Sequence, residues 1–82
     1  MYEIIKRQLV ECANLKEEEI RPDAHLKEDL GFDSIYAAEL TLELEEYFNI
    51  SISWEEMKDV VYVKDVVDLV ERKLGKKWKL KN

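Results

Sequence analysis

Apolar residues recur at intervals of three and four in three separate stretches, and this periodicity limits the fold more than any other feature of the sequence. Residues 2–14, 34–48 and 63–74 each place apolar side chains on one helical face. Ser53 and Glu56 have the spacing of a capping box, which predicts a short helix at 54–59. No stretch shows a strand pattern. We therefore expect an all-α, four-helix bundle of three longer helices and one short helix, with a long loop between helices one and two.

The expected loop, residues 15–33, is long for a compact domain, and such connections are usually functional. Pro22 interrupts any helix there, because proline and the residue before it both disfavour helical geometry. His25 has no nucleophile near it in sequence, which favours a loop-packing role over catalysis. Four apolar residues are expected to hold the loop on the bundle: Leu15, Ile20, Leu26 and Leu30.

The 82 residues are enough for one domain with a modest core. The single cysteine, Cys12, excludes an internal disulfide, and no zinc-ligand spacing is present. There is no apolar run of membrane length and no signal peptide, so we expect a cytoplasmic protein that does not insert into membranes. We expect residues 1–75 to form the domain. Residues 76–82, with four lysines and no acid, form a basic tail that frays or folds back onto the acidic surface.

Negative charge is concentrated in the middle of the chain. The formal net charge is −6, but residues 1–75 carry nine basic and nineteen acidic side chains, and residues 28–57 carry nine acids and no base. Such a field repels nucleic acid and anionic membranes and attracts basic protein surfaces. The alternative is that these acids only keep a small domain soluble.

The expected second helix separates its apolar and acidic residues. Its buried stripe comprises Ala37, Leu40, Leu44 and Phe48. The acids Glu39, Glu43 and Glu46 fall on nearly the opposite face, with Ile35 and Leu42 at the border and Tyr36 beside the stripe. Carboxylates beside exposed hydrocarbon favour a docking surface for a protein partner. The alternative is that Ile35 and Leu42 contact another part of the bundle.

Ser34 opens this helix, where backbone N–H groups are unpaired and the helix dipole is positive. That environment suits a phosphate ester on the serine hydroxyl. The simpler interpretation is that Asp33 or Ser34 caps the helix. No histidine or lysine is placed by sequence to activate Ser34, and no phosphate-binding glycine loop or calcium loop is present. We therefore predict no catalytic residue and no metal site, and a serine that is modified rather than reactive.

The segment Asp29-Leu30-Gly31-Phe32-Asp33-Ser34-Ile35, followed by an acidic helix, resembles the acyl carrier proteins. The resemblance extends from the first helix to about Leu74. It implies that a phosphopantetheinyl transferase attaches 4′-phosphopantetheine from coenzyme A to Ser34, beside Asp33. The thiol of this arm then carries acyl groups as thioesters between enzymes. The resemblance also implies a monomer whose second helix meets basic patches on partner enzymes through Glu39, Glu43, Glu46, Ile35 and Leu42, with the cargo often enclosed between helices two and three.

Three residues depart from the commonest fatty-acid carriers: Phe32, Ile35 and Tyr36. Aromatic residues dominate interface contacts, so Phe32 and Tyr36 are expected to shape the rim that a partner meets. These departures favour a polyketide, peptide-hybrid or specialised lipid pathway, with general fatty-acid synthesis as the alternative. A second class of protein stays open, an unmodified acidic helical adaptor that binds a basic partner. A small hydrolase is disfavoured, because no base lies near the serine.

Overall fold

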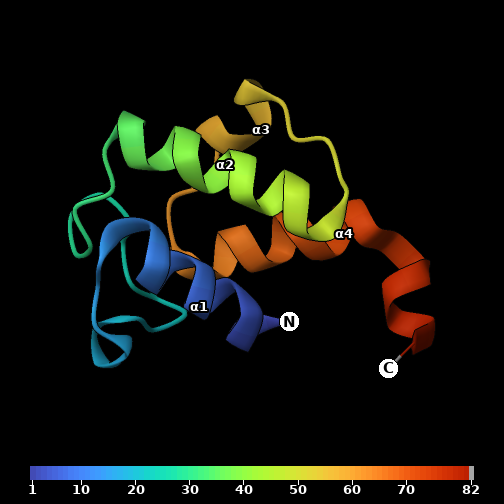
Figure 1. Cartoon of the computed structure of the whole chain (residues 1–82), viewed down its shortest axis with the longest axis horizontal. Coiled ribbons are helices and arrows are strands. Elements are labelled where there is room, and N and C mark those ends of the chain that lie inside the picture. The colour runs from blue at the N-terminus through green and yellow to red at the C-terminus, as the bar shows by residue number, and fades with distance from the viewer. Residues whose placement is uncertain (82) are drawn as a thin grey trace.

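The structure, a computed structural model, describes residues 1–81, with side chains described as far as Gly75. Its elements are the helices α1 (Tyr2–Ala13), α2 (Ser34–Phe48), α3 (Trp54–Lys58) and α4 (Val63–Lys81), and the short 3₁₀ helix η1 (Glu17–Glu19) (Figure 1). In the described residues the only β-type pairing is an isolated bridge between His25 and Tyr62. The predicted all-α fold with one short helix is confirmed; η1 was not predicted.

The helices run in two directions around one core. In Figure 1, α2 and α4 both run from left to right, and α1 runs the opposite way. The long loop between α1 and α2 closes one end of the bundle, and α3 lies beside α2. This arrangement places the start of α2 next to the loop and to α3.

The helix ends follow local chemistry. Asn14 and Asn49, at φ 54° and 55°, end α1 and α2 in the left-handed conformation that asparagine tolerates. Accordingly, α1 stops one residue before its predicted end, and α2 has its predicted bounds. Ser53 and Glu56 form the predicted capping box, with Ser53 N–H donating to Glu56 Oε1 at 2.9 Å and Glu56 N–H donating to Ser53 Oγ at 3.1 Å.

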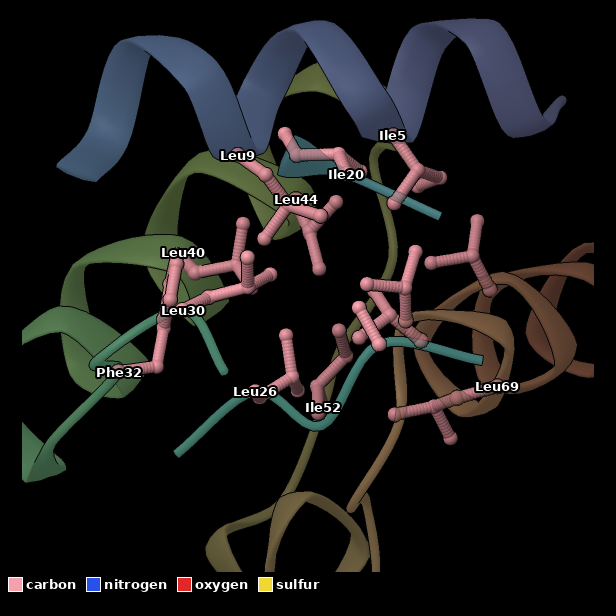
Figure 2. Packing of buried hydrophobic residues seen from close by; sticks show 14 residues of the cluster. Ile5, Leu9, Ile20, Leu26, Leu30, Phe32, Leu40, Leu44, Ile52 and Leu69 are labelled. Atoms are coloured by element: carbon pink, nitrogen blue, oxygen red, sulfur yellow. The ribbon is translucent and has the colours of Figure 1, made fainter. Parts of the chain in front are cut away.

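The core draws on α1, α2, α4 and the long loop. In Figure 2 the side chains of Ile5 and Leu9 from α1 point toward Leu44 of α2, with Leu26 and Leu30 of the loop below them. All five are buried. The prediction that the loop is held by apolar residues is confirmed: Ile20, Leu26 and Leu30 are buried, and Leu15 packs against the core. The long loop is therefore a structural part of the bundle.

The last helix bends at Gly75, which has φ 63° and ψ −151°. Helical hydrogen bonding resumes beyond it to Lys81, so the helix expected over residues 63–74 continues past a break at Gly75. The side chains of residues 76–81 and all of residue 82 lie outside the described structure, and with them the expectation that the basic tail folds back. Among the residues described, no helix combines the length and apolar character needed to cross a bilayer.

Candidate functional site

The start of α2 is capped by Asp33. Its Oδ1 accepts hydrogen bonds from the backbone N–H groups of Ile35 at 3.0 Å and Tyr36 at 3.1 Å. Asp33 has extended backbone geometry, as an N-cap residue should. Ser34 is consequently the first helical residue. Its side chain is exposed, and its hydroxyl has no hydrogen-bond partner among the described residues. Of the two candidates for the cap, the structure selects Asp33 and leaves the serine hydroxyl available.

The loop before Asp33 is fixed by its own hydrogen bonds. Asp29 Oδ2 accepts from the backbone N–H of His25 at 2.8 Å, and His25 Nδ1 accepts from the N–H of Glu28 at 3.0 Å. Gly31 has φ 72°, a left-handed conformation that side chains other than glycine rarely adopt. A Cβ there would meet nothing within 4 Å, so the requirement for glycine is conformational rather than steric. His25 therefore organises the loop, consistent with its predicted packing role.

Phe32 does not lie where the sequence suggested. Its side chain is only 6% exposed and belongs to the core cluster, as Figure 2 shows. The backbone N–H of Phe32 donates to the carbonyl of Leu26 at 2.8 Å, so the backbone of Phe32 is held next to the buried Leu26. The prediction that Phe32 forms part of the exposed, partner-facing rim is therefore wrong. Of the two aromatic residues that flank Ser34 in sequence, Tyr36 is the exposed one, and its ring centroid lies 5.7 Å from that of Phe32.

Two hollows lie beside Ser34. The first has a volume of about 530 Å³ and lies between the loop, the start of α2 and the end of α3. Its lining includes Leu26, Phe32, Ser34, Ala37, Leu40, Met57 and Val60. The second has a volume of about 520 Å³ and lies between α2 and α3. Its lining includes Ser34, Ala37, Ala38, Leu42, Ile52, Trp54 and Met57. Ser34 thus lies at the edge of two mainly apolar recesses.

The exposed side of α2 carries apolar side chains beside acids. Ile35 is 68% exposed and Leu42 is 62% exposed, and Tyr36 is also exposed. Among the described residues, Ile35 and Leu42 are therefore not covered by the rest of the bundle. Trp54, at the start of α3, is 75% exposed and extends the apolar surface across the second hollow. Periodicity did not identify Trp54 as part of this surface, because it belongs to a different element.

The three acids predicted on this surface are not equivalent. Glu39 and Glu46 are exposed, whereas Glu43 is half-buried and its Oε2 is buried without a hydrogen-bond partner in the described structure. The end of α1 lies against this part of α2: Cys12 Sγ is 3.6 Å from the carbonyl oxygen of Tyr36 and 3.9 Å from Glu39 Oε2. The helical wheel placed Glu43 in solvent because it ignores the neighbouring helix.

Cys12 is not suited to carry an acyl group. Burial, followed by the negative charges of Glu43 and Glu39, raises the pKa of its thiol to about 11. Because the thiolate is the nucleophile, this thiol is poorly reactive near neutral pH. Cys12 is the single cysteine of the sequence, so the chain itself offers only a poorly reactive thiol for thioester formation. In the described residues, no group of three or more His, Cys, Asp or Glu side chains could hold a metal ion.

The geometry fits a covalently attached phosphate ester. The Ser34 hydroxyl is exposed, has no internal partner among the described residues, and lies at the positive end of a 15-residue helix. No described histidine or lysine forms a hydrogen bond with it. A small helical domain with such a serine at the start of a helix suits modification of the hydroxyl.

Comparison with known proteins agrees with this class. The sequence model of a family described as phosphopantetheine attachment site matches residues 3–75. The acyl carrier protein of Wolinella succinogenes is 41% identical over 71 residues, which cover 87% of this chain and 93% of that protein.

Two solved structures are also similar. A proposed acyl carrier protein from Mycobacterium tuberculosis has a TM-score of 0.76 at 31% identity, covering 82% of this chain and 89% of that one. The apo doublet acyl carrier protein from prodigiosin biosynthesis has a TM-score of 0.72 at 25% identity, covering 84% of this chain and 33% of that one. The chain belongs to the acyl carrier protein family. It is therefore a carrier rather than an enzyme, and its prosthetic group is 4′-phosphopantetheine.

Proposed function

We propose that Ser34 is the residue that carries the phosphopantetheine arm. The main support is that Asp33, rather than Ser34, caps α2. The Ser34 hydroxyl is therefore exposed and has no internal partner among the described residues. A phosphodiester on Ser34 lies in the favourable field of the helix N-terminus, a contribution of roughly 0.3–1 kcal/mol. The thiol of the arm then supplies the reactive sulfur that Cys12 does not.

The carrier delivers acyl thioesters to partner enzymes through the exposed surface of α2. Ile35, Tyr36 and Leu42 provide apolar contact, and Glu39 and Glu46 provide negative charge next to them. Glu43 contributes to the negative field, although its half-buried position limits direct contact. The fitting partners are a phosphopantetheinyl transferase and acyl-handling enzymes with basic docking patches, approached by a monomeric carrier.

We assign the carrier function to residues 1–75, with residues 76–82 as a basic extension. The match of the family model to residues 3–75 supports this boundary, as does the break of α4 at Gly75. The pathway is polyketide, peptide-hybrid or specialised lipid synthesis, with general fatty-acid synthesis as the alternative. Ile35 and the exposed Tyr36 support the specialised assignment, whereas Phe32 no longer contributes to it because it is buried.

The test uses intact mass. The purified chain is incubated with coenzyme A and a broad-specificity phosphopantetheinyl transferase, beside Ser34→Ala and the matched control Ser51→Ala, which changes another exposed serine. We expect the unmodified chain and Ser51→Ala to gain the mass of one phosphopantetheine, and Ser34→Ala to gain none. If the chain stays unmodified while an established carrier is loaded in the same reaction, the acidic adaptor becomes the better description. Loading of Ser34→Ala would place the arm elsewhere.

A further inference from the structure

His25 closes a turn in the loop that leads to Ser34, and it does so with both its backbone and its ring. Its Nδ1 accepts a hydrogen bond from the backbone N–H of Glu28 at 3.0 Å. Its own N–H donates to Asp29 Oδ2 at 2.8 Å. Its carbonyl oxygen accepts from the N–H groups of Asp29 at 2.8 Å and Leu30 at 3.2 Å. The turn is therefore closed by hydrogen bonds that meet at one residue.

The same turn is attached to the segment that begins α4. His25 and Tyr62 form the isolated β-bridge, and their rings meet edge to face, with centroids 5.5 Å apart and planes at 78°. Next to them, the N–H of Leu26 donates to the carbonyl of Val61 at 2.9 Å. Val63, the first residue of α4, is fully buried. The turn around His25 is thus fixed to a firmly packed part of the fold.

The backbone between this turn and Ser34 is held at two further points. The N–H of Phe32 donates to the carbonyl of Leu26 at 2.8 Å, and Asp33 caps α2. His25 and Ser34 line the same hollow, although they lie at opposite ends of this segment. Because the residues between them are bonded back to the turn, a change in the turn alters the placement of Ser34.

We infer that His25 is a positioning residue for attachment of the arm: its ring nitrogen, as an acceptor, holds the loop in the arrangement that presents Ser34. The inference rests on the proposed attachment at Ser34. In attachment, the Ser34 oxygen forms a bond to the phosphorus that bears pantetheine in coenzyme A. The bond from that phosphorus to adenosine bisphosphate breaks, and the hydroxyl proton passes to the transferase. Such a step is sensitive to the placement of the attacking oxygen.

The experiment compares attachment rates within one reaction. Equal amounts of the unsubstituted protein and one variant compete for limiting transferase with excess coenzyme A, and intact mass gives the loaded fraction of each. The ratio of initial loading rates equals the ratio of kcat/KM, and the transferase's own properties cancel. His25→Ala removes the acceptor, whereas in His25→Asn the side-chain oxygen can accept the Glu28 N–H, as asparagine does in turns. The matched control Tyr62→Leu removes the ring contact and keeps the backbone bridge.

We expect kcat/KM for loading to fall by between about twofold and 30-fold in His25→Ala, the range that loss of a capping hydrogen bond produces in a local equilibrium. His25→Asn and Tyr62→Leu should stay within about twofold of the unsubstituted protein. As a readout independent of loading, the Glu28 N–H should exchange with solvent faster in His25→Ala but not in His25→Asn. If His25→Ala does not fold, Asp29→Ala, which removes the acceptor of the His25 N–H, provides the test and should also slow loading.

Two results would overturn this role. His25→Ala could be loaded as fast as the unsubstituted protein although its Glu28 N–H exchanges faster. Alternatively, His25→Asn could be loaded as slowly as His25→Ala, and a slow Tyr62→Leu would then assign the effect to ring packing. Failure of the two proposals is distinguishable by mass. An unsubstituted chain that accepts no arm refutes both, whereas equal loading of that chain and His25→Ala at Ser34 refutes only the role of His25.

Discussion

The α4 side and the α3 side of this molecule are packed very differently. Val63, Val66, Leu69 and Val70 of α4 are at most 1% exposed, whereas α3 has no buried residue. Both hollows border α3 through Met57. The fold thus has a closely packed part, which we call the frame and which comprises the buried residues of α1, α2 and α4. It also has a weakly packed part, which we call the wall and which is α3 (Trp54–Lys58). The proposed attachment residue lies on α2, next to that wall.

The position of α3 depends on hydrogen bonds and an ion pair rather than on buried apolar side chains. The five residues of α3 are too few to form a stable helix alone, because helix nucleation is costly. The Ser53–Glu56 capping box and the Glu56–Lys73 ion pair hold it instead. Segments with few buried contacts open locally at lower free energy than the core. Among the described residues, the α3 wall is thus the region expected to open locally at the lowest free energy.

The largest expected effect is a difference in the free energy of unfolding between a substitution in the frame and one in the wall. Leu44→Ala, at a side chain with no exposed surface, should lower the free energy of unfolding by about 2–5 kcal/mol. Trp54→Ala, at the exposed start of α3, should change it by no more than about 0.5 kcal/mol. Urea denaturation followed by circular dichroism measures both. Similar losses in the two variants would show that α3 is as firmly packed as the frame.

A smaller effect on stability is expected at the start of α2, next to the wall. Asp33→Ala should lower the free energy of unfolding by about 0.5–2 kcal/mol, because Asp33 accepts two N–H groups at the start of α2. Ser34→Ala should leave stability nearly unchanged, although it removes the proposed attachment oxygen. Thermal denaturation of the two variants makes the comparison. A loss in Ser34→Ala equal to that in Asp33→Ala would mean that the serine hydroxyl also caps the helix.

The anchoring of α3 should depend on pH. Lys73, followed by the backbone of Ser53, lowers the pKa of the Glu56 carboxyl from its ordinary value of 4.5. A lowered carboxyl pKa in the folded state stabilises the fold above 4.5, and this contribution is lost as pH falls through the folded-state value. Amide hydrogen exchange, corrected for intrinsic rates, should show α3 losing protection in acid before α1.

The control for this prediction is Glu56→Gln, which removes the titrating group and keeps the shape of the side chain. In that variant α3 should exchange faster than in the unsubstituted protein at neutral pH, and the additional loss in acid should be reduced. An acid-induced loss at α3 that is identical in both proteins would assign the pH dependence to other carboxylates.

The smallest effect concerns the acidic segment. Because residues 28–57 contain nine acids and no base, their mutual repulsion should weaken as salt rises. We expect the melting temperature of the unmodified protein to increase by a few degrees between low and moderate salt. A double Glu39→Gln, Glu46→Gln variant should show a smaller increase. An unchanged melting temperature across this range would show that the acids are too dispersed to repel each other appreciably.

Helix positions were predictable from sequence where local chemistry decides them. The start of α2 follows from Asp33, which can accept backbone N–H groups, and its end from Asn49, which tolerates left-handed geometry. The capping box likewise locates α3. Ser34 could be predicted as a residue for modification because the same segment supplies a helix start, an acidic helix and no catalytic base; this role stays a prediction.

Phe32 and Glu43 were not predictable in the same way. Neither position carries local information about its neighbours: Phe32 is buried in the core cluster, and Glu43 is half-buried and close enough to Cys12 of α1 to affect the pKa of its thiol. The two hollows, both lined by Met57, require knowledge of how α3 sits against α2. Helical periodicity fixes which face of a helix is apolar, but it does not say which other segment covers that face.

The sequence by itself determined the helical elements, the acidic character of the middle of the chain and the serine at the start of α2. These depend on spacing, capping and charge, which act over a few residues. Only the tertiary structure decided that Asp33 rather than Ser34 caps α2, that Phe32 joins the core, and that two mainly apolar recesses lie beside Ser34. Those outcomes depend on the directions of side chains and on contacts between distant segments, which no local pattern encodes.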